Sequence, residues 1–308
     1  CYIGLALAAT GTSRIKLGTG VTNTFTRHPA VTACAIATVH AVSEGRAFLG
    51  IGRGDSALAH LGFSPTPPKR FEDYLVRLQG YLRGEEVPFE AGGNVDALRL
   101  ANQPTASRIE WLRPGRYPKV PVDVAATGPK VIAAAARHAD SITFAVGADP
   151  RRIRWGIETA RQARTAAGLE EKMPFGAYVN VVVHDDPEVG RRLGEGGVSL
   201  FARFSAMHGA AVGPTTDEEK RVMEGIHDAY DMPRHSRAGS PQAGVISSEF
   251  AQEFGIFGNP AYCIERLQEL LALGLQRLVV VGSSAGADPA EAARAEQRFV
   301  EEVLPTLH

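Results

Sequence analysis

A carboxylate that directly follows alternating glycines can act as an acid or base beside a flat ligand, because glycine leaves room for the ligand to approach. The sequence carries this pattern in FLGIGRGDSAL, in which Gly50, Gly52 and Gly54 alternate and Asp55 follows. A dinucleotide-binding G-x-G-x-x-G loop is disfavoured, since its third glycine is replaced by an aspartate that would repel a pyrophosphate. Asp55 is therefore predicted to be an active-site acid or base, and the alternative is that it pairs with Arg53 or caps the following helix.

A second stretch, ATGPKV, has the composition of an anion site. Gly128 and Pro129 stand between an apolar run and a helical segment, and Lys130 adds a positive charge. The N-terminus of a helix presents free backbone N–H groups to an anion. The stretch is predicted to bind a phosphate, and a plain tight turn would account for the same residues.

A third stretch, GTGVTNTFTRHP, places a polar Thr22-Asn23-Thr24 at the end of an apolar run. His28 precedes a helical segment and is interpreted as a structural cap rather than a base. The other histidines show no metal-ligand spacing, and no G-x-S-x-G elbow occurs, so neither a metal site nor a nucleophilic serine is predicted.

Short β-rich runs separated by helical segments must position these three stretches. Several runs are apolar without alternation, which favours strands buried on both faces of a parallel sheet. Such βα units predict either a doubly wound sheet or a (β/α)8 barrel. In both, polar loops after the strands lie at the carboxyl edge, so the three stretches are expected at one mouth. The predicted strands cover residues 15–22, 47–52, 120–126, 141–147, 175–183 and 277–283.

Six strands are two fewer than a complete barrel needs. Residues 1–14 have the pattern of a helix, so the first two βα units are expected to be absent from this sequence. Residues 1–308 are predicted to form one domain with insertions at about 85–119 and 207–250. The first insertion is predicted to contain a hairpin of 87–90 with 97–100. The second has a helical patch at 218–230 and is expected to be a lid or poorly ordered.

The composition limits the classes of binding partner and the cellular compartment that are expected. The 308 residues carry 33 basic and 34 acidic side chains, a net charge of −1, so neither nucleic acid nor an anionic membrane is expected as a partner. Three cysteines without a C-x-x-C pair suit a reducing cytoplasm. No apolar run approaches the roughly 20 residues of a membrane-spanning helix.

Taken in order, TGVTNTFTRHPAVTA, GRAFLGIGRGDSAL and VPVDVAATGPKV resemble the bacterial luciferase-like family of flavin and deazaflavin oxidoreductases. The likeness is to its coenzyme F420 branch, which contains methylenetetrahydromethanopterin reductase, and it extends to the C-terminal GLQRLVVVGS and RFVEEVLPTL. The resemblance implies an α/β fold, a (β/α)8 barrel with insertions, and commonly a homodimer.

The resemblance also implies roles for individual residues. A non-prolyl cis peptide at Gly20-Val21 would back the deazaflavin ring together with Thr22, and Gly52, Arg53 and Gly54 would meet the cofactor. The phosphate-bearing tail would lie against the segment Ala126, Thr127, Gly128 and Pro129, and Lys130, predicted above from its charge, would bind the same group. Asp55 falls where sugar-phosphate dehydrogenases of the family carry a catalytic glutamate.

The predicted function is hydride transfer between coenzyme F420 and a small organic substrate in the cytoplasm. Alternatives are an FMN-dependent monooxygenase and a barrel homologue without catalysis. Glucose 6-phosphate is an unlikely substrate, because the strand that carries a lysine in sugar-phosphate members reads Tyr178-Val-Asn180 here. Arg298 resembles their phosphate-binding arginine but stands alone.

Overall fold

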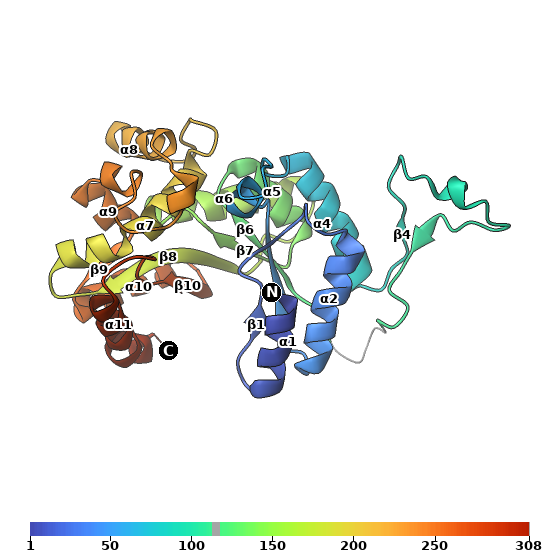
Figure 1. Ribbon diagram of the computed structural model, residues 1–308, viewed down its shortest axis with the longest axis horizontal. Helices are drawn as coiled ribbons and strands as arrows, with labels where there is room; N and C mark the ends of the chain where they lie inside the picture. Colours follow the sequence, from blue (N-terminus) through green and yellow to red (C-terminus); the bar gives the residue numbers. More distant parts are fainter. Residues whose placement is uncertain (113–117, 308) are drawn as a thin grey trace. The chain divides into compact units, whose positions relative to one another are not determined.

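The computed structural model describes residues 1–112 and 118–307, and the chain divides into two compact units (Figure 1). Unit one comprises Cys1–Val124 and His138–Asp140, and unit two comprises Ala125–Arg137 and Ser141–His308. Each is described by itself.

Parallel strands form the sheet of unit one. Strands β1 (Leu17–Gly18) and β2 (Thr22–Asn23) both pair with β3 (Ala47–Gly52), which pairs in turn with β6 (Val122–Ala126). Leu49 lies opposite Val122 and Ile51 opposite Val124, and all four are completely buried. Burial explains why these runs are apolar without alternation.

Helices flank this sheet, and their boundaries follow local rules. Helix α2 (Pro29–Val42) begins with proline in its first turn, and Nδ1 of His28 accepts a hydrogen bond from the N–H of Ala30 at 3.2 Å. The predicted capping role of His28 is confirmed. The remaining α-helices of unit one are α1 (Tyr2–Gly11), α3 (Asp55–Ala59) and α4 (Pro68–Leu82), which packs beside α2 (Figure 1).

The first predicted insertion contains a hairpin, but its second strand differs from the prediction. Strand β4 (Val87–Pro88) pairs antiparallel with β5 (Ala106–Ser107), whereas Val95–Leu98 forms the 3-10 helix η1. The pairing of 87–90 with 97–100 is therefore wrong. Backbone bonds within 94–99 close tight turns there, and Arg99 has a φ of 49°, so this stretch is not extended. Residues 113–117 of this insertion lie outside the described residues.

Unit two is built on a second set of parallel strands. Strand β8 (Phe175–Val183) pairs with β7 (Ser141–Phe144), with β10 (Arg277–Val281) along its first half, and with β9 (Ile256–Gly258) near its end. Five of the six predicted strands are thus confirmed, whereas the predicted run 15–22 is divided into β1 and β2 and β9 was not predicted. The helices are α5 (Pro129–His138), α6 (Pro150–Ala166), α7 (Pro187–Ser205), α8 (Asp217–Asp228), α9 (Ser248–Phe254), α10 (Pro260–Ala272) and α11 (Pro289–Arg298), with the short helices η2 (Met232–Arg234), η3 (Ala243–Val245), η4 (Phe299–Val303) and η5 (Leu304–Thr306).

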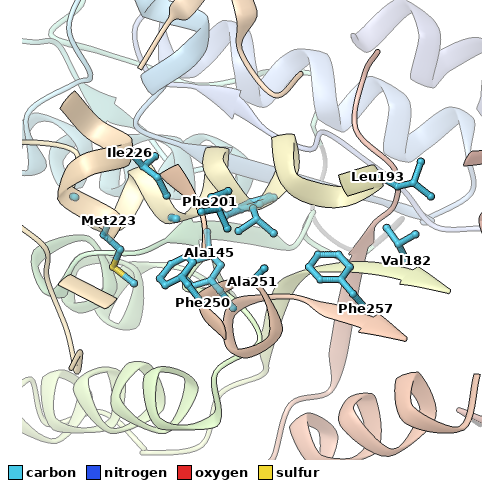
Figure 2. Packing of buried hydrophobic residues seen from close by; sticks show 14 of the residues in the cluster. Ala145, Val182, Leu193, Phe201, Met223, Ile226, Phe250, Ala251 and Phe257 are labelled. Carbon is cyan, nitrogen blue, oxygen red and sulfur yellow. The ribbon is translucent and has the colours of Figure 1, made fainter. Parts of the chain in front are cut away.

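The segment 207–250, expected to be a lid or poorly ordered, is packed into unit two. Met223 and Ile226 of α8 and Phe250 of α9 are at most 4% exposed. They join Phe201 of α7 in one apolar cluster (Figure 2). Burial of these side chains against α7 holds the segment in place. No sequence motif predicts this packing.

A buried arginine holds the connection between α7 and α8. Arg152 of α6 is 1% exposed and donates to the carbonyl oxygens of Val146, Val212 and Pro214 and to Oγ of Ser205, at 2.8 to 3.1 Å. Burial lowers the pKa of its guanidinium to about 10.

Candidate active site and family membership

Two loops of unit one come together at the carboxyl ends of β2 and β3. The Gly20-Val21 peptide bond is cis, as the resemblance implies, and Thr22 and Asn23 pair with Ile51 and Gly52. Parallel strands bring their carboxyl ends to one edge of the sheet, so this pairing places Gly20–Asn23 beside the start of the Gly52–Asp55 loop.

The first loop is shaped by an asparagine. Oδ1 of Asn23, a residue that is 9% exposed, accepts from the N–H groups of Phe25 and Thr26 at 3.0 Å and from Oγ1 of Thr26 at 3.1 Å. An asparagine that binds the following backbone in this way fixes a turn. The loop is therefore held in one conformation by its own sequence.

A threonine contributed by the segment before α4 ties both loops together. Oγ1 of Thr24 donates to Oγ1 of Thr66 at 3.0 Å, and Nε of Arg53 donates to the carbonyl oxygen of Thr66 at 2.5 Å. The N–H of Thr66 in turn donates to the carbonyl oxygen of Arg53 at 3.1 Å. Thr66 was not predicted as a site residue, and only the prolines that follow it mark this segment in the sequence.

Asp55 lies in the first turn of α3, half-buried, after Gly54 as the N-cap residue. Burial lowers the pKa of Arg53, and the negative charge of Asp55 partly offsets that effect. A carboxylate is also favoured at the N-terminus of a helix. The carboxylate is thus placed for either of the predicted alternatives, acid–base chemistry or a structural interaction with Arg53 and the helix.

The glycines of this motif serve a different purpose from the predicted one. A Cβ on Gly50 would lie 2.0 Å from the carbonyl oxygen of Thr19, and one on Gly54 would lie 2.7 Å from Cβ of Asn23. Gly54 also has a φ of 83°. These two glycines therefore let protein segments approach each other, and the prediction that they leave room for a ligand is wrong for both.

The residues predicted to bind a phosphate lie together in unit two. Ala126 ends β6, Oγ1 of Thr127 donates to the carbonyl oxygen of Ala145 at 3.1 Å, and α5 begins at Pro129. The N–H groups of Val131 and Ile132 donate to the carbonyl oxygen of Gly128. The earlier N–H groups of such a helix have no partner within it.

Comparison with known proteins identifies the family. Residues 1–277 match the luciferase-like monooxygenases. The chain belongs to this family. A 5,10-methylenetetrahydromethanopterin reductase of Methanolobus tindarius is 26% identical over 293 residues, which cover 92% of this chain and 82% of the relative. A phthiodiolone/phenolphthiodiolone dimycocerosates ketoreductase of Mycobacterium tuberculosis is also 26% identical, over 88% of this chain and 71% of the relative.

Solved structures show the same fold. The coenzyme F420 dependent tetrahydromethanopterin reductase of Methanopyrus kandleri matches with a TM-score of 0.71 at 24% identity, over 100% of this chain and 88% of that one. An F420-dependent secondary alcohol dehydrogenase, solved with an F420-acetone adduct, matches with a TM-score of 0.68 at 16% identity, over 100% and 84%. The predicted α/β barrel class is confirmed by these matches.

A luciferase-like enzyme of the deazaflavin branch must accommodate a flat ring and an anionic tail, and the predicted residues fit both. Apart from the adjacent residues, no heavy atom of the described part of the chain lies within 4 Å of the position that a Cβ would take on Gly20 or on Gly128, so both backbones are open to a ligand. Val21 is 41% exposed and offers an apolar surface to a ring. Lys130, exposed at the start of α5, and the N–H groups of that turn match a phosphate.

The described residues show neither a metal centre nor a membrane-spanning helix. Across residues 1–112 and 118–307, no group of three or more metal-ligating side chains is arranged to hold a metal ion. Within that same described part, none of the helices combines the length and the apolar character that crossing a membrane requires.

Proposed function

We propose that this luciferase-like protein is an oxidoreductase that transfers hydride between coenzyme F420 and a small organic substrate. The observation that carries the proposal is the match of the whole chain, with a TM-score of 0.71, to an F420-dependent reductase. The 5,10-methylenetetrahydromethanopterin reductase of Methanolobus tindarius, which matches 92% of the chain, also supports the proposal. A bound deazaflavin supplies the carbon that accepts or donates the hydride.

The chain itself supplies positioning and a proton. In unit one, Gly20, Val21 and Thr22 back the ring, and Gly52–Gly54 border it. Because the Asn23 turn and the Thr66 contacts fix these loops, the ring would be held without further ordering of the protein. Asp55 is assigned as the group that gives or takes the proton that accompanies hydride transfer.

The residues of unit two are assigned to anion binding. Ala126–Lys130 would hold a phosphate of the cofactor, with Thr127 fixed by its bond to Ala145 and Lys130 supplying charge. Arg298 is not assigned to a substrate phosphate. Its guanidinium already donates to Asp185 at 3.1 Å and to Glu302 at 2.8 Å, which supports the exclusion of glucose 6-phosphate.

The assembly and the compartment are also proposed. A homodimer is supported by apolar side chains exposed on the adjacent helices α1 and α2, where Ile3 is 80%, Leu7 69% and Val31 55% exposed. A reducing, cytoplasmic setting is supported by Cys1, Cys34 and Cys263, which are all free thiols.

Titration of the protein with coenzyme F420 and, separately, with FMN tests the cofactor. Quenching of cofactor fluorescence gives the dissociation constant for each. Micromolar binding of F420 with FMN at least tenfold weaker is expected. Micromolar FMN binding without F420 binding would instead make this chain an FMN-dependent member of the family, and binding of neither would leave the homologue without catalysis.

A further inference from the structure

Two exposed aromatic rings of unit one lie close together, one just after the Gly20–Asn23 loop and the other in the connection between α3 and α4. The rings of Phe25 and Phe63 pack at a tilt of 41° with their centroids 4.7 Å apart, and the two residues are 49% and 50% exposed. Leu61, two residues before Phe63, is 57% exposed. Large apolar side chains gathered on a surface commonly mark a binding site.

Hydrogen bonds fix the backbone of both residues that carry the rings. The N–H of Phe25 donates to Oδ1 of Asn23, and the N–H of Phe63 donates at 2.8 Å to the carbonyl oxygen of Leu58, which is completely buried. The Thr24–Thr66 bond then joins the two segments on which the rings stand. Because the loops are already ordered, a ligand that stacks on the rings would not have to order them.

The surroundings of the pair favour an apolar ligand over a charged one. The nearest basic group along the first loop is Arg27, whose guanidinium lies 5.5 Å from the ring centroid of Tyr2 and donates to Oγ1 of Thr26. The connection between α3 and α4 contributes the exposed, uncharged Leu61 and Ser64 together with one titratable side chain, the exposed His60. The Nε of Arg53 is already bonded to the carbonyl oxygen of Thr66 in this connection. Phe25 follows Thr22 by three residues, and three residues of chain span at most about 11 Å, so the pair lies within that distance of the segment assigned to the deazaflavin ring.

We infer that Phe25 and Phe63 bind the apolar part of the substrate, and that the substrate is a neutral compound bearing an aromatic or branched aliphatic group beside its reactive carbon. This inference rests on the proposed function, because it places the reactive carbon next to Val21 and Thr22. Phe25 and Phe63 determine specificity and take no part in proton or hydride transfer.

The test measures binding of acetophenone, a neutral aromatic ketone, and of glycerol 3-phosphate, a small phosphorylated compound, by saturation-transfer NMR. Acetophenone is expected to bind the wild-type protein. The Phe25→Ala/Phe63→Ala double variant should bind it at least tenfold more weakly. The control is Phe89→Ala, which removes a 37% exposed phenylalanine from the β4–β5 insertion and should bind acetophenone as the wild type does.

Three outcomes overturn the inference: no acetophenone binding to the wild type, equal binding by the double variant, or glycerol 3-phosphate binding that the double variant loses. The F420 titration, repeated on each protein, separates the two claims. Absence of F420 binding to the wild type refutes the proposed function. Acetophenone binding is measured without cofactor, so it tests the inference about Phe25 and Phe63 separately. Should the double variant fail to fold, Phe25→Leu/Phe63→Leu keeps the apolar bulk and is expected to weaken acetophenone binding at least threefold.

Discussion

The two units hold the segments outside their sheets by different means. In unit one, short polar contacts of Asn23, Thr24 and Thr66 fix loops that remain near the surface. In unit two, segment 207–250 is held by apolar side chains such as Met223 and Phe250, which are buried against α7 (Figure 2). The Asn23 turn, which is fixed by contacts to residues two and three positions later, can be read from the sequence. The Thr24–Thr66 bond, which joins residues 42 positions apart, and the packing of segment 207–250 cannot.

Removing a core side chain from unit two should have the largest effect. Phe250→Ala deletes a ring that is 4% exposed and stacks on Phe254 with centroids 5.2 Å apart. We expect the free energy of unfolding to fall by about 3–5 kcal/mol. Urea unfolding measures it, with Phe89→Ala as the exposed control. A loss below about 1 kcal/mol would show that apolar packing does not hold this segment.

Removing the carboxylate of unit one should instead affect turnover. Asp55→Asn keeps the shape of the side chain and removes its charge, so turnover is expected to fall roughly 100-fold while F420 affinity is unchanged. Steady-state kinetics and the fluorescence titration check both. The exposed Asp96→Asn is the matched control. Unchanged turnover with a lower melting temperature would assign Asp55 to the first turn of α3.

The buried tyrosine of unit one should make stability depend on pH. Burial raises the pKa of Tyr74 to about 12, and its hydroxyl bonds to Thr32 and to the carbonyl oxygen of Arg27 at 2.7 and 3.1 Å. Tyr74 therefore ionises at a lower pH in the unfolded state than in the folded state. Its contribution to the free energy of unfolding is fully present below about pH 10 and is lost as the pH rises toward 12.

Urea unfolding at about pH 9 and about pH 11 tests this dependence. The wild type should lose about 1 kcal/mol more between these pH values than Tyr74→Phe does. Burial likewise raises the pKa of Cys263 to about 11. This lowers the stability of the wild type and of Tyr74→Phe by the same amount at high pH, so it cancels in the comparison. Parallel profiles would mean that the Tyr74 hydroxyl titrates as it does in the unfolded chain.

The smallest expected effect concerns the exposed lysine of unit two. Lys130→Ala should weaken F420 binding about threefold, because an exposed charge is screened by solvent and salt. The difference should shrink at high salt. Lys172→Ala, another exposed lysine of unit two, should leave the dissociation constant unchanged. A salt-independent loss would point to a packing role for the Lys130 side chain.

The sequence predicted most of the strands, because buried parallel strands leave apolar runs. The Gly20-Val21 cis bond was implied by the family resemblance. The sequence did not predict the partner of β4, since that pairing depends on where a long loop turns. The role of Gly50 was also missed. Its contact with Thr19 joins residues 31 positions apart, and nothing in a glycine's neighbours along the chain reveals such an approach. Thr66 was missed for the same reason.

The buried Arg152 has a consequence for hydrogen exchange. Val212 and Pro214 cannot leave their places without unpairing an enclosed guanidinium that also bonds to Val146 and Ser205. A charge left buried without acceptors is costly, so these attachments should open together rather than one at a time. The amides from the end of α7 to the start of α8 should therefore exchange as one cooperative unit, at a rate close to that of α6, although the connection between the two helices is irregular.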